Sequence, residues 1–307
     1  GGTSYPLNGQ IAEMIFFTRS VSDNERISIE RYLSNKYNIA SSSQSSRYKQ
    51  WSDKSGNNLH FKQDGWAFAP QYTSSANSQS FGFQSEYSNS SFDSISQRFM
   101  MDGTFSDLIS DANSTQFIVF SSNRLSGYKY FAGTVGPSVG NWYYALGTYN
   151  TRLFYEDPAN HFSPSSDHTL STGQRTIGVF DINTTDDTVE FYIDGHDAGE
   201  RTTTNNPSVP SYGYSIGNGG THAGIYGYGF DGNIHEYLIY TGSVSDADRT
   251  KIETYLQNKW GVTVATQSSD LTSDNFDTAY PTQSFFSEVQ SNCSLWADFT
   301  DTTKVKT

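Results

Sequence analysis

Four carboxylates cluster in the sequence around residue 195, and paired carboxylates are what glycoside hydrolysis requires. A retaining mechanism needs two of them about 5–5.5 Å apart, which alternate positions of one strand can provide because they share a face. The four are Glu190, Asp194, Asp197 and Glu200. However, Asp194-Gly195 is a strong hairpin signal, so we expect these acids around a turn rather than along a single strand.

No other pattern of reactive residues supports catalysis. The six histidines show no H-x-x-x-H spacing, which disfavours a zinc site, and no Gly-x-Ser-x-Gly motif marks a serine nucleophile. The chain has one cysteine, Cys293, so an intrachain disulfide is excluded. We therefore expect no catalytic residues.

A repeated segment defines the elements that flank these residues. Residues 8–39 align without a gap to residues 231–262, and 15 of the 32 paired positions are identical. In each copy an alternating apolar stretch predicts a strand, and a serine followed three residues later by an acid predicts a helix start. The predicted helix carries an apolar stripe, which in the second copy is Ile252, Tyr255, Leu256 and Trp260.

Between the two copies the chain alternates short strand-like runs with polar turns. The runs are 94–101, 115–121, 129–135, 142–149, 152–155, 175–182, 188–194 and 214–217. No stretch of helical period competes with them between residues 60 and 240, and regularly spaced strands are typical of a sandwich or barrel. We expect an all-β, jelly-roll-like antiparallel β-sandwich with one short α-helix after its last strand, and a partial second copy at the N-terminus.

Composition excludes two classes of partner. The net charge is −13, and an acidic surface repels phosphate backbones, so we expect no nucleic acid. No apolar run approaches the roughly 18 residues of a membrane helix, so we expect no membrane partner. The chain is 15% aromatic and only 17% charged, which is typical of extracellular or virion-surface β-proteins.

The end of the repeated segment is the most specific motif of the chain. Gly232-x-Ile234-x-Glu236, then Ser-Val-Ser-Asp and Tyr-Leu-x-Asn-Lys-Trp-Gly, resembles the end of a laminin-G-like domain of the concanavalin A-like lectin/glucanase superfamily. Residues 51–58 and 189–195 resemble a turn and a hairpin of these domains, and residues 295–298 resemble their opening strand. In these domains the opening strand comes before the turn, but no similar strand is found between Ile39 and Trp51, and in this respect the chain departs from the pattern. The Glu-x-Asp-x-x-Glu motif of the superfamily's glucanases is also missing.

The resemblance implies a possible calcium ion at the rim of the sandwich. Hard oxygen ligands are available in two places, and we take Asp53, Asn57, Asp181, Asp186 and Asp187 as candidate calcium ligands. The hairpin acids Asp194 and Asp197 are further oxygen donors. Asp and Asn are also the commonest turn formers, and no spacing here matches an EF-hand.

The resemblance also implies glycan binding, which needs exposed aromatic side chains to stack on sugar rings and polar groups to bind hydroxyls. The stretch 212–230 offers both among glycines that permit close approach. The candidate glycan-binding residues are Tyr212, Tyr214, Asn218, His222, Tyr226, Tyr228 and, elsewhere, Trp142. The alternatives are a packed hairpin at 212–230 and a core position for Trp142.

The repeat predicts three parts. Residues 1–40 are expected to be the C-terminal strand and helix of a preceding laminin-G-like unit, 41–263 a complete sandwich, and 264–307 a linker and the first strand of a following unit. In one hypothesis the Leu295 strand of one chain pairs with the Gly9–Asn38 unit of another, joining subunits head to tail. In the other, the chain is an arbitrary stretch of an array.

Together these features predict a non-catalytic adhesion or structural module of a repeat-containing extracellular or virion (phage fibre-like) protein. Its expected partners are cell-surface polysaccharide or glycan and neighbouring repeats or subunits. One alternative is a purely architectural subunit that contacts only its neighbours in an assembly. The other is a polysaccharide-active, glucanase-like enzyme.

Overall fold

The chain forms two separate units, Gly1–Ser45 and Ser46–Thr307. The structure is a computed structural model that describes residues 13–20, 50–62, 70–75, 78–83, 98–109, 113–135, 145–156, 161–162, 168–202, 213–218, 229–264 and 293–298. Of the first unit, only residues 13–20 are described. Among the described residues, no helix combines the length and apolar character needed to span a membrane.

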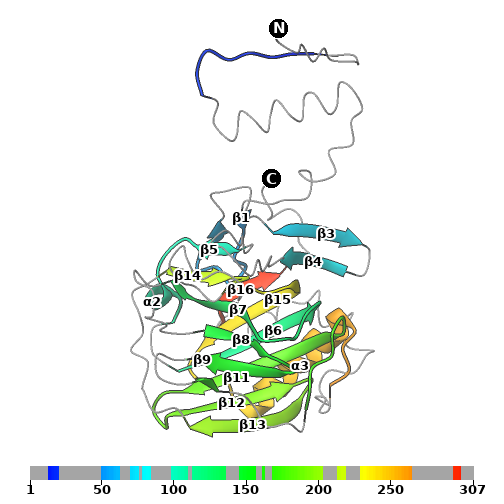
Figure 1. Ribbon diagram of the computed structural model, residues 1–307. Coiled ribbons are helices and arrows are strands. Elements are labelled where there is room, and N and C mark those ends of the chain that lie inside the picture. Colours follow the sequence, from blue (N-terminus) through cyan, green and yellow to red (C-terminus); the bar gives the residue numbers. More distant parts are fainter. Residues whose placement is uncertain are drawn as a thin grey trace. The chain divides into compact units, whose positions relative to one another are not determined.

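The second unit contains two antiparallel sheets (Figure 1). The first, named here the β7 sheet, has the strand order β1 (Gln50–Trp51), β2 (Phe61–Lys62), β5 (Phe99–Met101), β14 (Gly213–Ile216), β7 (Tyr128–Val135), β8 (Ala145–Tyr149), β9 (Arg152–Glu156), β10 (His161–Phe162). The second, the β15 sheet, has the order β13 (His196–Thr202), β12 (Thr188–Ile193), β11 (Arg175–Asn183), β6 (Ser114–Ser122), β15 (Gly232–Thr241), β4 (Ser78–Phe83), β3 (Gln71–Ser75). This confirms the predicted jelly-roll-like sandwich.

The main core lies between the two sheets because alternate residues of each strand point inward. In β12 the inward residues Val189, Phe191 and Ile193 are buried, whereas the residues between them are half-exposed. The β7 sheet contributes further apolar side chains to the same core, including Leu153 and Tyr155 of β9.

Helix α3 (Asp246–Trp260) covers the outer face of the β15 sheet (Figure 1). Its predicted apolar stripe lies in one cluster with outward residues of β6, β11, β15 and β16 (Cys293–Asp298), among them Val119, Val179 and Leu238. The predicted start is confirmed, since the Ser245 hydroxyl accepts the Asp248 backbone N–H at 3.2 Å. The helix ends at Gly261, whose φ of 66° is the left-handed conformation that glycine adopts readily.

The strand β16 (Cys293–Asp298) lies beside β15, although residues 265–292 separate it from the helix that follows β15. The pairing is antiparallel, with Leu238 opposite Trp296. Strand β15 therefore has β6 on one side, and β4 and β16 on successive parts of the other. The Leu295 segment thus forms the predicted strand, and its partner is the last strand of the same chain's sandwich.

Two expectations about secondary structure are wrong. Residues 13–17, the described part of the first predicted strand, are not in a strand, since a strand forms only where a neighbouring strand takes up its backbone hydrogen bonds. A short helix, α2 (Phe105–Leu108), interrupts the stretch where only strands were expected. A capping box between Thr104 and Asp107 starts this helix, and Phe105 and Leu108 anchor it in the core.

Candidate functional site

The repeated acid Glu236 is a structural residue. It is fully buried in β15 and accepts hydrogen bonds from the Tyr255 hydroxyl at 2.8 Å and the Trp260 indole N–H, while the Lys259 ammonium lies 3.0 Å away. All three partners belong to α3, so the carboxylate fixes the helix on the sheet. Arg249, which also belongs to α3, does not take part in this cluster and binds Glu253 and Asp246, both at 3.2 Å.

The first candidate calcium ligands, Asp53 and Asn57, lie in a turn that holds β16. Asp53 accepts the backbone N–H groups of Ser55 at 2.8 Å and Leu59 at 3.2 Å. The Asn57 amide donates to the carbonyl oxygen of Ser294 in β16 at 3.0 Å, and the Ser55 hydroxyl does so at 3.2 Å. The turn at residues 51–58 thus closes its own loop and binds the edge of β16.

Two of the remaining candidate calcium ligands, Asp181 and Asp186, accept hydrogen bonds from other side chains of the protein. Asp181 lies in β11 and accepts the Thr115 hydroxyl at 3.0 Å, and burial raises the pKa of its carboxyl. Asp186 accepts the Asn183 amide at 2.8 Å, while Asp187 occupies the left-handed turn position with a φ of 53°. Within the described ranges, no group of three or more His, Cys, Asp or Glu side chains is placed to hold a metal ion.

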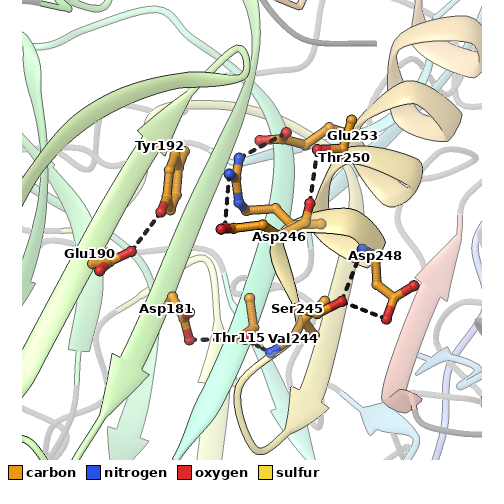
Figure 2. A network of polar contacts seen from close by, with 11 residues as sticks. Thr115, Asp181, Glu190, Tyr192, Val244, Ser245, Asp246, Asp248, Thr250 and Glu253 are labelled. Carbon is orange, nitrogen blue, oxygen red and sulfur yellow. Dashed lines mark hydrogen bonds and ion pairs between the residues drawn. The ribbon is translucent and has the colours of Figure 1, made fainter. Parts of the chain in front are cut away.

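The start of α3 joins β12 through a polar network (Figure 2). The Arg249 guanidinium lies 3.7 Å from the centre of the Tyr192 ring, and the Tyr192 hydroxyl donates to Glu190 at 2.5 Å. Of the four acids around residue 195, Glu190 and Glu200 are paired across β12 and β13, whereas Asp194 lies in the predicted hairpin turn. The Asp194 carboxylate accepts the Ile177 backbone N–H at 2.7 Å, and burial raises its pKa to about 6.

Two of the predicted glycan-binding residues are described, and both are buried. Tyr214 is fully buried between the sheets, with its hydroxyl 2.6 Å from that of Tyr237. It cannot stack on a sugar, so its assignment to a glycan site is corrected. Asn218 is 7% exposed, and its backbone carbonyl accepts the Ser215 hydroxyl at 2.7 Å. The other candidates, Tyr212, His222, Tyr226, Tyr228 and Trp142, lie outside the described residues.

An aromatic cluster on the outer face of the β7 sheet offers a different site. It is separate from the core between the sheets, and its members are Tyr128, Tyr130, Ala145, Tyr149 and Phe154. Strand register places Tyr128 opposite Tyr149 and Tyr149 opposite Arg152, across β7, β8 and β9. We call these three side chains the Tyr128 row. All three are half-buried, and the two tyrosine rings have centres 4.4 Å apart.

Behind the Tyr128 row the outer face is tightly packed. Phe154 is fully buried, with the Tyr128 and Tyr130 rings edge-on to it at 5.4 and 5.3 Å. Its place across β8 depends on Gly147, since a Cβ there would lie 2.7 Å from the Phe154 ring and 2.0 Å from the Lys129 carbonyl oxygen. The Tyr128 row therefore lies against closely packed side chains and backbone of β7, β8 and β9.

A buried carboxylate completes this face. Glu156, at the far end of β9, accepts the Tyr130 hydroxyl at 2.5 Å, a distance typical of hydrogen bonds to carboxylates. In the described strands β7, β8 and β9 it is the sole acid, whereas glycoside hydrolysis requires two. The face offers aromatic rings and a guanidinium, which are groups that bind ligands.

The alternation that forms this face is visible in the sequence. Tyr128 and Tyr130 are two residues apart, as are Arg152, Phe154 and Glu156, and both runs fall in or next to predicted strands. The sequence does not show which side of each strand points outward, because that depends on where the second sheet lies. The site was missed for this reason.

No protein-family model matches the chain, and no curated protein sequence matches it. Solved structures of similar architecture include a heptameric SAP-like pentraxin from Limulus polyphemus, with 12% identity over 64% of this chain and 90% of that chain and a TM-score of 0.45. Another is domain 4 of AbnA, a GH43 extracellular arabinanase from Geobacillus stearothermophilus in complex with arabinotriose, with 15% identity, 65% and 95% coverage and a TM-score of 0.44. A third is the Ruminococcus gnavus IT-sialidase CBM40 bound to α2,3-sialyllactose, with 10% identity, 44% and 79% coverage and a TM-score of 0.39. At these identities, and with TM-scores below 0.5, the similarities establish no family or ligand for this chain.

Proposed function

We propose that this chain is a non-catalytic carbohydrate-binding module whose site is the Tyr128 row on the outer face of the β7 sheet. The half-exposed pair Tyr128 and Tyr149, beside Arg152, carries this proposal. The outer face of the other sheet is covered by α3. Tyr128 and Tyr149, by contrast, each keep part of their surface exposed.

The chemistry of the row suits a sugar. An aromatic face stacks on the C–H groups of a pyranose, while hydroxyl and guanidinium groups bind its oxygens. A few such contacts give a weak site, and modules of this kind gain strength when several copies act together. Display on an extracellular or virion surface fits this role and is part of the proposal.

Binding of the full chain to a panel of immobilised polysaccharides tests the proposal. We expect Tyr149→Ala and Tyr128→Ala to lose most of the binding of the wild-type chain. The matched control is Tyr192→Ala, which removes a half-buried tyrosine from the other sheet and is expected to bind normally. Equal binding by all three variants would exclude the Tyr128 row. Running the panel with calcium and then with a chelator tests whether binding requires the calcium ion that the sequence resemblance implies.

A second candidate role is architectural, and residues 13–17 favour it. Met14, Ile15, Phe16 and Phe17 are 40–82% exposed, although their counterparts in β15, residues 237–240, are at most 3% exposed. The first copy also retains the residues that fix α3, with Glu13 matching Glu236 and Lys36 matching Lys259. Residues 13–17 form no strand within this chain. We therefore propose that the segment 8–39 completes its strand and helix only against a neighbouring sandwich unit, as in a tandem array.

A further inference from the structure

The strands that carry the Tyr128 row differ in charge from the rest of the chain. The whole chain has 19 basic and 32 acidic residues. Between residues 113 and 155, by contrast, the sequence has no Asp or Glu, and its charged residues are Arg124, Lys129 and Arg152. This segment spans β6, β7, β8 and the start of β9.

Two of these cations lie at the end of the sheet that bears the row. Arg124 is exposed in the connection from β6 to β7, where its Nε donates to the Ser126 hydroxyl at 2.9 Å. The backbone N–H of Asn150 donates to the Gly127 carbonyl oxygen at 3.1 Å, and the Gly127 N–H donates to the Asn150 side-chain oxygen, also at 3.1 Å. The Arg124 loop is thereby tied to the turn that immediately precedes Arg152.

Two acids described near this end of the sheet, Asp231 and Glu156, have other partners. The Asp231 carboxylate accepts the Asn123 amide at 3.2 Å and is close enough to act on the charge of Lys129, which is buried. Glu156 is bonded to Tyr130 and lies four residues along β9 from Arg152. In an extended strand, that separation is about 13 Å. Within the part of the chain that the structure describes, the Arg152 guanidinium therefore has no carboxylate among its register partners in β8 or its neighbours on the outer face.

We propose that the Tyr128 row recognises an acidic sugar, with Arg152 binding its carboxylate or sulfate group while Tyr149 and Tyr128 stack on the ring. The inference rests on the proposed function and narrows its ligand class. A guanidinium binds such oxyanions through two parallel hydrogen bonds, which an ammonium cannot do. Because the whole chain is strongly negative, long-range attraction does not bring a polyanion to it. Binding therefore requires a local site of this kind.

The test compares three immobilised polysaccharides of similar size: polygalacturonate for carboxylates, dextran sulfate for sulfates and unmodified dextran as the neutral arm. We expect the full chain to bind one or both acidic polymers at least 10-fold more tightly than dextran, with binding that weakens as salt rises. Arg152→Gln should lose at least 10-fold in affinity, and Arg152→Lys should recover only part of it. Arg201→Gln is the control, because Arg201 is a half-exposed arginine on β13 of the other sheet.

The possible outcomes distinguish a failure of the acidic-sugar inference from a failure of the proposed carbohydrate binding. Equal binding of dextran and the acidic polymers, unaffected by Arg152→Gln, would overturn the acidic-sugar inference and leave carbohydrate binding in place. Equal losses in Arg152→Gln and Arg201→Gln would also overturn it, since the attraction would then be non-specific. No binding to any polysaccharide on the wider panel would overturn both proposals.

Discussion

At the scale of single residues, Glu236 explains why the repeated motif has the composition it has. A carboxylate in the middle of a buried strand is costly unless it is paired and fully hydrogen-bonded. Tyr255, Lys259 and Trp260 supply these bonds from one side of α3. The Glu of the strand and the Tyr, Lys and Trp of the helix thus form one cluster, although about twenty residues separate them in the chain.

Removing this carboxylate should weaken the fold strongly. We expect Glu236→Ala to lower the free energy of unfolding by about 3–5 kcal/mol, because the Lys259 ammonium and two other donors would remain buried without their acceptor. Urea unfolding followed by tryptophan fluorescence measures the loss. The control, Glu200→Ala, truncates an exposed acid on β13 and should change the free energy by less than about 0.5 kcal/mol. A similar small effect at Glu236 would show that α3 does not depend on the cluster.

A second buried acid, Glu253, should make stability depend on pH. Burial raises its pKa from 4.5 to about 7, and the nearby Arg249 only partly opposes this. The folded chain then holds the proton more tightly than the unfolded chain, so the associated stability is present below about pH 4.5 and is lost as pH rises towards 7.

Glu253→Gln should remove this dependence. Between pH 5 and 8 we expect the unfolding free energy of the wild-type chain to fall relative to that of the variant by about 1–3 kcal/mol. Asp194, whose pKa is also raised, acts in the same direction in both proteins. Because the charge of Asp194 also raises the pKa of Glu253, the difference between the two proteins reports Glu253 together with its coupling to Asp194. A difference that stays constant across this range would contradict the assignment.

At the scale of elements, β16 is part of the folded core although it is distant in sequence from the strand with which it pairs. Leu295 is fully buried in the core between the sheets, and Cys293 is buried in the cluster beneath α3. The backbone N–H of Thr241 donates to the Ser294 hydroxyl at 3.1 Å. One short strand thus seals both faces of the β15 sheet.

Truncating Leu295, the buried side chain in the middle of this strand, should therefore lower the free energy of unfolding substantially. We expect Leu295→Ala to lower the unfolding free energy by about 2–5 kcal/mol, the usual range for a fully buried leucine. Asn57→Ala, which removes only the half-exposed bonds to the β16 carbonyls, should cost about 1 kcal/mol. Both are measured by urea unfolding. Equal, small losses would indicate that β16 does not form part of the folded core.

The elements that the sequence predicts well are those with strong local patterns. The eight strands expected between residues 94 and 217 all correspond to observed strands, because each is a short run rich in apolar, β-branched or aromatic residues between polar turns. Strands β1 and β2 have only two residues each and show no alternation. The partner of β16 was not predicted, because strand pairing across residues 265–292 leaves no local trace.

The candidate site was predicted less well than the fold. Tyr214 has the composition of a ligand-binding loop around it, yet it fills the core because its strand faces the other sheet. Tyr149 lies in a predicted strand and looks like any other strand aromatic. Which tyrosine reaches solvent is decided by the packing of two sheets, and that is a property of the whole fold.

At the scale of the whole molecule, the repeat provides its own matched experiment. Phe16 and Ile239 occupy equivalent positions, but Phe16 is 82% exposed and Ile239 is fully buried. We expect Phe16→Asp to leave thermal unfolding unchanged and to reduce self-association in sedimentation, because it removes an exposed apolar side chain. Ile239→Asp should prevent folding. A lower melting temperature for Phe16→Asp would show that residues 13–17 are packed in the full chain.

The position of β16 near the end of this sequence also determines when the sandwich can be completed during translation. Ser55 and its partner Ser294 are 239 residues apart, and ribosomes add about 5–20 residues per second. Synthesis of Ser294 therefore follows that of Ser55 by roughly ten to fifty seconds, and the turn cannot bind β16 before then. During translation, the nascent chain carries β15 with one edge only partly covered, which is the type of edge that recruits strands from other molecules. Slow translation of residues 265–292 would prolong this exposure, so the codons of that segment bear on how much of the protein matures rather than aggregates.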